Sequence, residues 1–470
     1  MNYIPNTERE RQRMLSEIGV ESIEDLFSDI SPALWLNREL NLPAGMSEYE
    51  VIKHVQGLAA LNHGADDYVC FLGGGSYDHF IPRAVFEILG RSEFYTAYTP
   101  YQAEVSQGIL QSIFEYQSLM CELTDMEISN ASMYDGATAM AEAATMSVRQ
   151  TRRGQIMVSK AVHPEYRAVL RTYAHALGLT IKEIDFQEGQ TDLDAIRDHI
   201  TNETACLILQ NPNFLGYIEP MAAASEIAHR AGALFVACVD PVSLGILSPP
   251  GEYGADIAVG EGQGLGNPLN FGGPYLGFLT CRNEFIRNMP GRVVGETTDN
   301  LGRRGYVLTL QAREQHIRRE RATSNICSNE ALCALAATVY LSLLGKSGIK
   351  EIGRLCVQKS HYAAKAIDSI SGFSIKYHAP FFKEFVVSCP MPPSSVVTRL
   401  KEHGILAGLD LGSIFSEMEE LQDGLMIAVT EKRTKDEIDR LAEGLRALAL
   451  EDEQGARHKS IQGREKGDQA

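Results

Sequence analysis

The carboxylate of Asp240 follows a run of six apolar residues, Leu-Phe-Val-Ala-Cys-Val at 234–239. Such a run is typical of a strand buried on both faces of a parallel sheet, and open α/β sheets bind ligands beyond the carboxyl ends of their strands. In cofactor enzymes of this architecture, an aspartate at that place pairs with a protonated pyridine nitrogen. The alternative, which a lone strand-end aspartate more often fits, is a carboxylate that caps a turn.

A second segment has the composition of an anion-binding turn. Residues 129–139 read Ser-Asn-Ala-Ser-Met-Tyr-Asp-Gly-Ala-Thr-Ala, and we predict that this turn enters a helix near Ala137. Asp135, Gly136 and Ala137 then stand at the positive end of the helix, where open backbone N–H groups suit a phosphate. The alternative is that Gly136 serves only the conformation of a tight strand-to-helix turn.

Two further loops contain residues that suit either binding or turn formation. Residues 210–216 read Gln-Asn-Pro-Asn-Phe-Leu-Gly after a predicted strand, and a polar loop there can bind a ligand or simply reverse the chain. Residues 260–277 are rich in glycine but do not match the spacing of a nucleotide-binding motif. We expect a close approach of this backbone to a ligand or to another polypeptide.

The chain lacks lysine over a long central stretch that includes most of these segments. The lysine that follows Lys182 is Lys346, although eleven arginines lie between the two. Enzymes that use pyridoxal phosphate hold it through a lysine Schiff base. If Asp240 and the turn at 129–139 belong to such a fold, this chain cannot anchor the cofactor in the usual place and needs a partner that can.

Short apolar runs alternate with amphipathic segments through the middle of the chain, which predicts parallel βαβ units. The fold class is therefore α/β, with a large domain at 70–328. We predict strands at 156–159, 180–184, 205–210 and 234–239, and helices at 164–177, 192–200 and 222–231.

Three flanking regions complete the predicted organisation. Residues 1–69 form a mostly helical amino-terminal arm, with Thr7 capping one helix and a second helix from Ser47 to Leu61. Residues 329–450 form a small α+β domain with a helix at 331–344 and strands near 385–389 and 425–429. Residues 451–470 contain almost no apolar side chains and are expected to be a disordered tail.

Composition restricts the function classes. The formal net charge of −18 disfavours nucleic acid and anionic membranes as partners. The nine cysteines are scattered singly, which indicates reduced thiols, and the first residues lack the basic start and apolar run of a secretory signal. No uncharged apolar run reaches the roughly 18 residues of a membrane span. We expect a cytoplasmic protein with no metal site.

Three segments resemble fold-type-I pyridoxal-phosphate enzymes and, among these, the glycine cleavage system P-protein. They are Phe-Leu-Gly-Gly-Gly-Ser-Tyr-Asp-His at 71–79, Tyr-Thr-Ala-Tyr-Thr-Pro-Tyr-Gln-Ala-Glu at 95–104, and Arg-Arg-Glu-Arg-Ala-Thr-Ser-Asn-Ile-Cys at 318–327. The resemblance covers about residues 1–450. It implies a transferase-like fold whose central sheet is mostly parallel, with helices on both faces and a smaller carboxyl-terminal α+β domain.

The resemblance also implies a division of labour between two chains. That family occurs as one long chain or as two half-length subunits, and only the carboxyl-terminal half carries the lysine, in a His-Lys pair. This chain has Gln263 and Gly264 at that pair, which identifies it as similar to the amino-terminal half, subunit 1. Subunit 2 then holds pyridoxal phosphate, glycine is decarboxylated there, and the aminomethyl group passes to the lipoyl arm of H-protein. An α2β2 heterotetramer is expected, with this chain inactive alone.

Within that resemblance, two groups of residues are candidates for reaching the partner's active site. Tyr98, Thr99 and Tyr101 offer hydroxyl donors for a phosphate or a substrate carboxylate, or else they only fill an interface. Arg319, with Thr323, Ser324 and Asn325, can bind an anion, as can Arg321, unless these arginines form structural ion pairs.

The expected remains of a cofactor site in this chain are Asp135, Gly136, Ala137, His163 and Asp240. His79 and His163 are candidates for its pocket, although a lone histidine is more often a satisfied structural residue. Two rival hypotheses stay open: a self-sufficient enzyme with a displaced lysine such as Lys160, and a regulator or scaffold that keeps the fold without chemistry.

Overall fold

The structure is a computed structural model, which describes residues 6–64, 67–270 and 272–467. The chain divides into two compact units, Met1–His63 and Gly64–Ala470. Each unit is described by itself.

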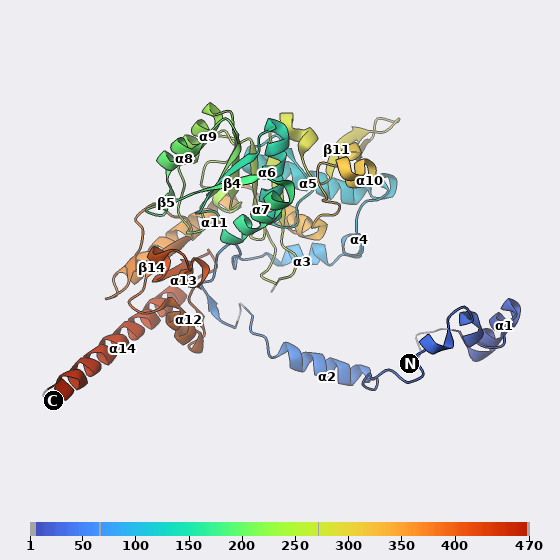
Figure 1. The fold of residues 1–470 in the computed structure, drawn as a ribbon, viewed down its shortest axis with the longest axis horizontal. Helices are drawn as coiled ribbons and strands as arrows, with labels where there is room; N and C mark the ends of the chain where they lie inside the picture. The colour runs from blue at the N-terminus through green and yellow to red at the C-terminus, as the bar shows by residue number, and fades with distance from the viewer. Residues whose placement is uncertain (1–5, 65–66, 271, 468–470) are drawn as a thin grey trace. The chain divides into compact units, whose positions relative to one another are not determined.

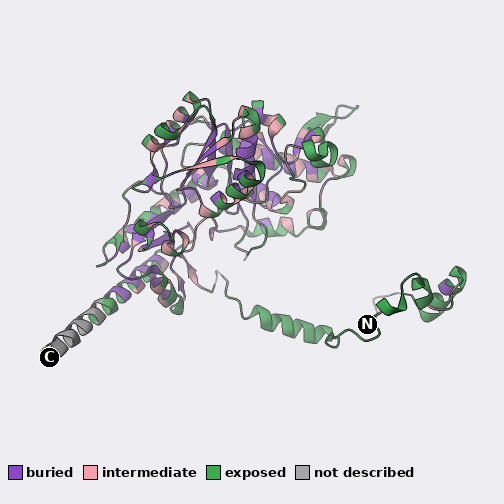
Figure 2. Ribbon diagram, in the orientation of Figure 1, coloured by how far each residue is buried: buried purple, intermediate pink, exposed green. Residues whose placement is uncertain are grey.

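The first unit is helical near its two ends. Helix α1 (Glu8–Ile18) begins with a capping box between Thr7 and Glu10, as the sequence predicts for Thr7. Helix α2 (Glu48–Ala59) begins with a second capping box, between Ser47 and Glu50. Between them the chain forms only two 3-10 turns, η1 (Glu24–Phe27) and η2 (Pro32–Leu34). The arm is thus less helical than predicted, and α2 has no buried residue (Figure 2).

The second unit is built on a seven-stranded sheet whose order is β2-β10-β9-β8-β7-β3-β4. Every described neighbour pair is parallel except the two pairs made by β10. The sheet is therefore mostly parallel, as predicted, and the four predicted strands are all present. The bounds are β2 Ile128–Ser129, β3 Gln155–Ser159, β4 Thr180–Ile184, β7 Thr204–Asn211, β8 Leu234–Val239, β9 Ile257–Glu261 and β10 Gly277–Cys281.

Alternate residues of each central strand belong to different apolar clusters. In β8, Val236 and Cys238 pack into one cluster, whereas Phe235 and Ala237 pack into another. Because successive side chains of a strand point to opposite faces, the sheet is buried on both sides. This explains why residues 234–239 are apolar without alternation.

Helices cover both faces of this sheet (Figure 1). Helices α6 and α7 pack together on one face, and α5, α9 and α11 contribute to the cluster on the other. The bounds are α3 Arg83–Leu89, α4 Ser92–Tyr95, α5 Gln107–Thr124, α6 Gly136–Thr151, α7 Pro164–Leu177, α8 Leu193–His199, α9 Met221–Arg230, α10 Gln315–Arg318 and α11 Ala331–Asp368. Helix α7 has the bounds that the sequence predicts.

Helix α11 extends well beyond the predicted 331–344. Its two parts meet at Gly345, which has φ +58° and a non-helical conformation. By length and composition it is the one described helix apolar enough to cross a membrane, and 44% of its most apolar window is buried within the fold. It packs against α3, α5 and α14 (Lys435–Gly467), so its apolar residues serve the protein core.

The small domain has an antiparallel sheet of order β13-β14-β17-β16. Its strands are β13 Ser374–Ile375, β14 Glu384–Ser388, β16 Leu409–Asp410 and β17 Gly424–Ala428, and its helices are α12 Pro393–Glu402, α13 Leu411–Ile414 and α14. Strand β1 (Val69–Cys70) pairs with β15 (Ile405–Leu406), so the predicted last residue of the arm, 69, and the predicted first residue of the large domain, 70, both pair with the small domain. The structure continues α14 to Gly467, where the sequence predicts a disordered tail, because Glu, Gln, Ala, Arg and Lys favour helix.

The second unit also contains short hairpins and 3-10 turns. Two hairpins are formed by β5 (Phe186–Gln187) with β6 (Gln190–Thr191) and by β11 (Val293–Thr298) with β12 (Arg304–Thr309). The 3-10 turns are η3 Ala103–Val105, η4 Ser243–Gly245, η5 Asn283–Asn288, η6 Gln311–Arg313, η7 Arg319–Arg321 and η8 Glu419–Leu421.

Candidate functional site

Polar side chains gather where the carboxyl ends of β8 and β9 meet the beginning of α6. Asp240 follows β8 and Glu261 ends β9, as expected for a ligand site of an open α/β sheet. They line a cavity of about 30 Å³ together with Tyr77, His163, Tyr166 and Gly264. That volume holds only about one or two water molecules.

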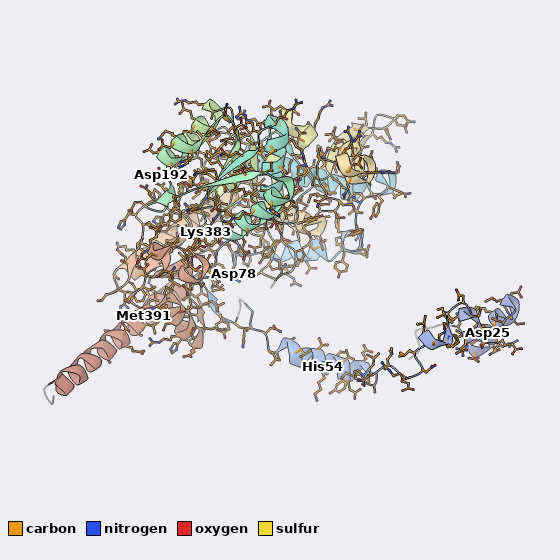
Figure 3. All side chains as sticks on the ribbon, in the orientation of Figure 1. Asp25, His54, Asp78, Asp192, Lys383 and Met391 are labelled. Carbon is orange, nitrogen blue, oxygen red and sulfur yellow. The ribbon has the colours of Figure 1, made fainter. Side chains whose placement is uncertain are left out.

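The carboxylate of Asp240 binds a lysine from the small domain. Lys383 Nζ lies 2.6 Å from Asp240 Oδ2, and the Lys383 side chain is only 2% exposed. The ammonium also lies 3.4 Å from the centroid of the Tyr77 ring, a cation–π contact. Figure 3 labels Lys383 where the elements of the large domain adjoin those of the small domain. Asp240 is thus neutralised by this chain itself.

The hydrogen bonds continue from Lys383 through His79 to Glu431. Lys383 Nζ lies 3.0 Å from His79 Nε2, and His79 Nδ1 lies 2.6 Å from Glu431 Oε2. An ammonium only donates, so Nε2 accepts and Nδ1 donates its proton to Glu431. Burial opposes ionisation of Glu431, but His79 and the Phe80 N–H together lower its pKa to about 2.

These contacts also decide against a cation among His79, Cys356 and Glu431. Their ligand atoms lie within 4.8 Å of one another. However, the Lys383 ammonium donates to one nitrogen of His79 and Glu431 accepts from the other. Burial raises the pKa of the Cys356 thiol, whereas metal ligation needs the thiolate. The cluster is a buried relay of hydrogen bonds.

Glu261 occupies the amino end of α6. Its Oε2 accepts from Gly136 N at 3.1 Å, and its Oε1 accepts from Gln263 N at 3.0 Å and Leu276 N at 2.9 Å. Burial raises the pKa of Glu261 to about 7, against the lowering effect of these donors. Asp135 caps the helix by accepting from Thr138 N at 2.7 Å. Ala137 is buried in the first turn of this helix. The helix begins at Gly136, next to the predicted Ala137.

The residues at the missing His-Lys pair bind the polypeptide itself. Gln263 Oε1 accepts from Tyr77 N at 2.9 Å, and Nε2 donates to Tyr77 O at 3.1 Å and Asn267 O at 2.7 Å. A Cβ on Gly264 would lie 3.1 Å from His79 Cδ2 and 3.2 Å from Val242 Cγ2. The glycine-rich loop therefore packs against other segments of this chain.

His163 has a structural environment at the cavity wall. Its Nε2 lies 2.8 Å from Gly74 O, and its ring stacks on Tyr166 with centroids 4.6 Å apart. Its backbone N–H donates to Gln210 Oε1 at 2.8 Å, so a side chain near the carboxyl end of β7 supports this turn. Burial lowers the pKa of His163.

Glu384, which begins β14, joins the same cluster. Its Oε1 accepts from Gly74 N at 2.7 Å, and its Oε2 accepts from the Tyr77 hydroxyl at 2.7 Å. Burial raises the pKa of Glu384 to about 7. The segment at 73–79, one of the three that carry the resemblance, thus connects both domains.

The predicted partner-facing residues lie elsewhere on the second unit. Tyr98 and Tyr101 are 71% and 77% exposed, with ring centroids 6.3 Å apart. The Tyr98 hydroxyl lies 3.3 Å from Ser328 Oγ, so the segment at 95–104 contacts the residue that directly follows the segment at 318–327. Thr99 accepts a hydrogen bond from Arg292. The structure therefore brings two of the three signature segments together on one surface.

Residues 319–325 divide into exposed and anchored groups. Arg319, Arg321 and Asn325 are exposed. Thr323 N donates to Arg313 O at 3.4 Å, and Ser324 Oγ donates to Glu142 Oε1 at 2.9 Å. Arg321 lies 3.9 Å from Glu320 with both side chains exposed, which is a weak ion pair. Its guanidinium remains available for an anion.

Lysine 160, the displaced lysine of one rival hypothesis, pairs with Asp185 and stands apart from the cavity. The lysine that does reach Asp240 is Lys383, which the sequence did not single out. Glu261 could have been found, because it ends the apolar strand 257–260 just as Asp240 follows 234–239. Lys383 gave no local signal, since its contact with Asp240 depends on how the two domains pack.

Comparison with solved structures assigns the class. The structure matches a C-DES variant with glycine covalently linked to its PLP cofactor, with a TM-score of 0.61 at 16% identity over 81% of this chain and 97% of that one. It also matches a glycine decarboxylase (P-protein) of the glycine cleavage system in inhibitor-bound form, with a TM-score of 0.87 at 44% identity over 95% and 100%. The fold is that of the fold-type-I pyridoxal-phosphate enzymes.

The family follows from the sequence matches. The model of the glycine cleavage system P-protein family matches residues 1–445. The chain belongs to that family. It is 55% identical to a probable glycine dehydrogenase (decarboxylating) subunit 1 of Moorella thermoacetica, over 95% of this chain and all of that protein. The protein of the same description from Carboxydothermus hydrogenoformans is 56% identical over 95% of this chain and 99% of its own length.

Pyridoxal phosphate does not fit the residues that this chain places at the former cofactor site. The carboxyl group of Glu261 takes the N–H donors where a phosphate would bind, and Lys383 takes Asp240. No amine stands at 263 or 264, and the cavity of about 30 Å³ is far too small for a substituted ring with a phosphate. Of the residues predicted to remain from a cofactor site, His163 and Asp240 line this small cavity, and Asp135, Gly136 and Ala137 form the start of α6.

Proposed function

We propose that this chain is subunit 1 of a two-subunit P-protein of the glycine cleavage system. A lysine-bearing subunit 2 holds pyridoxal phosphate, and the complex decarboxylates glycine and passes the aminomethyl group to the lipoyl arm of H-protein. The observation that carries the proposal is the combination of a family match over 1–445 with a cofactor site that its own side chains close. The chain then contributes through its surface and not through that pocket.

Two features support a large contact with another protein. Tyr95, Tyr98, Tyr101 and Val105 are 69–80% exposed within one short segment. Exposed apolar and aromatic groups that gather in this way are typical of protein interfaces. Helix α2 carries Val51, Ile52, Val55 and Leu58, each 43–54% exposed. An α2β2 heterotetramer in the cytoplasm is the assembly that we propose, and the nine unpaired thiols support a reducing compartment.

The test is reconstitution with a lysine-bearing subunit 2 and lipoylated H-protein. We expect label to exchange between bicarbonate and glycine only when both subunits are present, because this chain lacks a cofactor site and the partner lacks this surface. Each subunit alone with H-protein is the control. Full exchange by subunit 2 alone would leave this chain the role of regulator or scaffold, the alternative hypothesis. Exchange by this chain alone would contradict the closed site.

A further inference from the structure

Two charged groups of this chain stand where the two charged ends of a pyridoxal-phosphate cofactor bind in enzymes of this fold. A phosphate binds at a helix amino terminus, and an aspartate at a strand end pairs with the protonated ring nitrogen. Here the helix terminus is that of α6 and the aspartate is Asp240. Both have partners from within the chain.

At the anionic end, Glu261 provides the carboxyl group. It accepts three backbone N–H groups, those of Gly136, Gln263 and Leu276, at 2.9–3.1 Å. These donors come from the start of α6, from the loop after β9, and from the residue before β10. The carboxyl group thus joins three segments around one point, as an oxyanion ligand does.

At the cationic end, Lys383 provides the ammonium. It lies 2.6 Å from Asp240 Oδ2 and is held by the Tyr77 ring and by His79 Nε2. Lys383 directly precedes β14 of the small domain, whereas Asp240 follows β8 of the large domain. The ion pair therefore spans the boundary between the two domains.

We propose that Glu261 and Lys383 are built-in replacements for the two charged ends of the cofactor, so that this chain closes its cofactor site and joins its two domains without a ligand. The proposal concerns only this chain's own residues. It rests on the same closed site as the proposed function, but its tests measure phosphate and pyridoxal-phosphate binding by this chain alone, so its failure is distinguishable from a failure of glycine–bicarbonate exchange by the complex.

The anionic end is tested by vacating it and offering inorganic phosphate to the full chain. In Glu261→Ala, the N–H at the start of α6 and the two backbone N–H groups beside it lose their acceptor, and phosphate can replace it. We expect the melting temperature of this variant at pH 8 to rise by about 2 °C or more in 20 mM phosphate relative to chloride at equal ionic strength, beyond any rise in the wild type. Glu219→Ala is the matched control.

Glu219 is a fair control because it is also a buried carboxyl group that accepts backbone and side-chain donors, from Thr191 and Asn213, but these donors belong to strand β6 and to the loop after β7, and none is the N–H of a helix residue. An equal phosphate response in the wild type, or none in Glu261→Ala, would overturn the proposal. If Glu261→Ala is recovered only as insoluble protein, its refolding yield in phosphate against chloride gives the same decision, with Glu219→Ala again as control.

The cationic end is tested by adding pyridoxal phosphate to the wild-type full chain, reducing with borohydride and mapping modified lysines by mass spectrometry. We expect the peptide that contains Lys383 to remain unmodified, because its ammonium is paired and its side chain is 2% exposed. A phosphopyridoxyl group on Lys383 would overturn the proposal, since it would make this lysine a cofactor anchor.

Discussion

At the scale of single residues, the closed site depends on carboxyl groups whose ionisation is costly. Glu384 is 4% exposed and its pKa is raised to about 7 because burial disfavours its charged form. Lys383 lowers this pKa, while Asp240 raises it. The Tyr77 hydroxyl donates to Glu384, and burial raises the pKa of Tyr77 well above its ordinary value, so Tyr77 remains a donor at neutral pH.

Glu384 therefore predicts a pH dependence of stability. Between its ordinary pKa of 4.5 and its folded pKa of about 7, the folded protein retains a proton that the unfolded chain releases. The free energy of unfolding should then fall as pH rises through this window, by roughly 3 kcal/mol for this group. Glu384→Gln should remove that part of the slope, because an amide cannot ionise and the Tyr77 hydroxyl can accept from it. Urea denaturation at pH 5, 6 and 7 measures the effect.

Glu351→Gln is the control for this prediction. Glu351 is fully exposed, and its hydrogen bond with Arg354 lowers its pKa, so its own contribution is lost only as pH falls below 4.5. The slope between pH 5 and 7 should not change in this variant. An unaltered slope in Glu384→Gln would show that Glu384 ionises in the folded protein as it does in the unfolded chain.

At the scale of elements, the sequence predicted those strands that obey the βαβ alternation. Strand β3, helix α7 and strand β4 follow one another with the expected bounds. Strand β10 was missed because it follows a glycine-rich loop without an intervening helix and runs antiparallel to both neighbours. The hairpin of β11 and β12 was missed for the same reason, since no crossover helix separates its strands.

For the candidate site, too, the sequence predicted the residues that local patterns define and missed the others. Asp240, Gly136 and His163 lie at the ends of elements that local patterns define, and the structure brings them to one cavity wall or the adjacent helix terminus. Lys383 and Glu431 come from the small domain, whose packing on the large domain no local pattern describes. The groups that close the site are therefore largely those that the sequence could not place.

The ion pair between Asp240, which follows β8, and Lys383, which precedes β14, carries the second prediction, for Lys383→Met. Removing this lysine leaves Asp240 near the protein interior without its cation, which should lower the free energy of unfolding by roughly 3 kcal/mol. Adding Asp240→Asn should recover part of the loss, because no unpaired charge remains. Urea denaturation of the wild type, both single variants and the double variant gives the coupling energy, which we expect to exceed about 1 kcal/mol.

Lys160→Met provides the comparison for Lys383→Met. Lys160 pairs with Asp185, and these side chains are 30% and 70% exposed. Solvent screens such a pair, so its loss should cost less than about 1 kcal/mol. Equal losses in the free energy of unfolding of the two lysine variants would mean that the buried pair at the domain boundary stabilises the protein no more than an exposed pair does.

At the scale of the whole molecule, two of the described regions each carry several exposed apolar side chains close together in the sequence. One is the arm, where α2 has no buried residue, and the other is the segment at 95–105 (Figure 2). Burying such surface is the main favourable contribution to most protein association. If the cofactor site of this chain is closed, as we propose, the chain can affect a partner's active site only through such surfaces.

Variants of Tyr98 can distinguish whether this residue packs against the partner subunit or takes part in its chemistry. In Tyr98→Ala with Tyr101→Ala, two exposed rings are lost, and the affinity for the lysine-bearing subunit should fall by about 10- to 100-fold, as measured by isothermal titration calorimetry. Tyr362→Ala, at a tyrosine 38% exposed on α11 and hydrogen-bonded to Asp439, should leave the affinity unchanged.

Tyr98→Phe retains the ring but removes the hydroxyl. If the hydroxyl reaches the partner's phosphate or substrate, this variant should bind normally while glycine–bicarbonate exchange falls about tenfold or more. Normal exchange would assign Tyr98 to packing alone, and normal affinity in the double alanine variant would contradict a partner surface at residues 95–105.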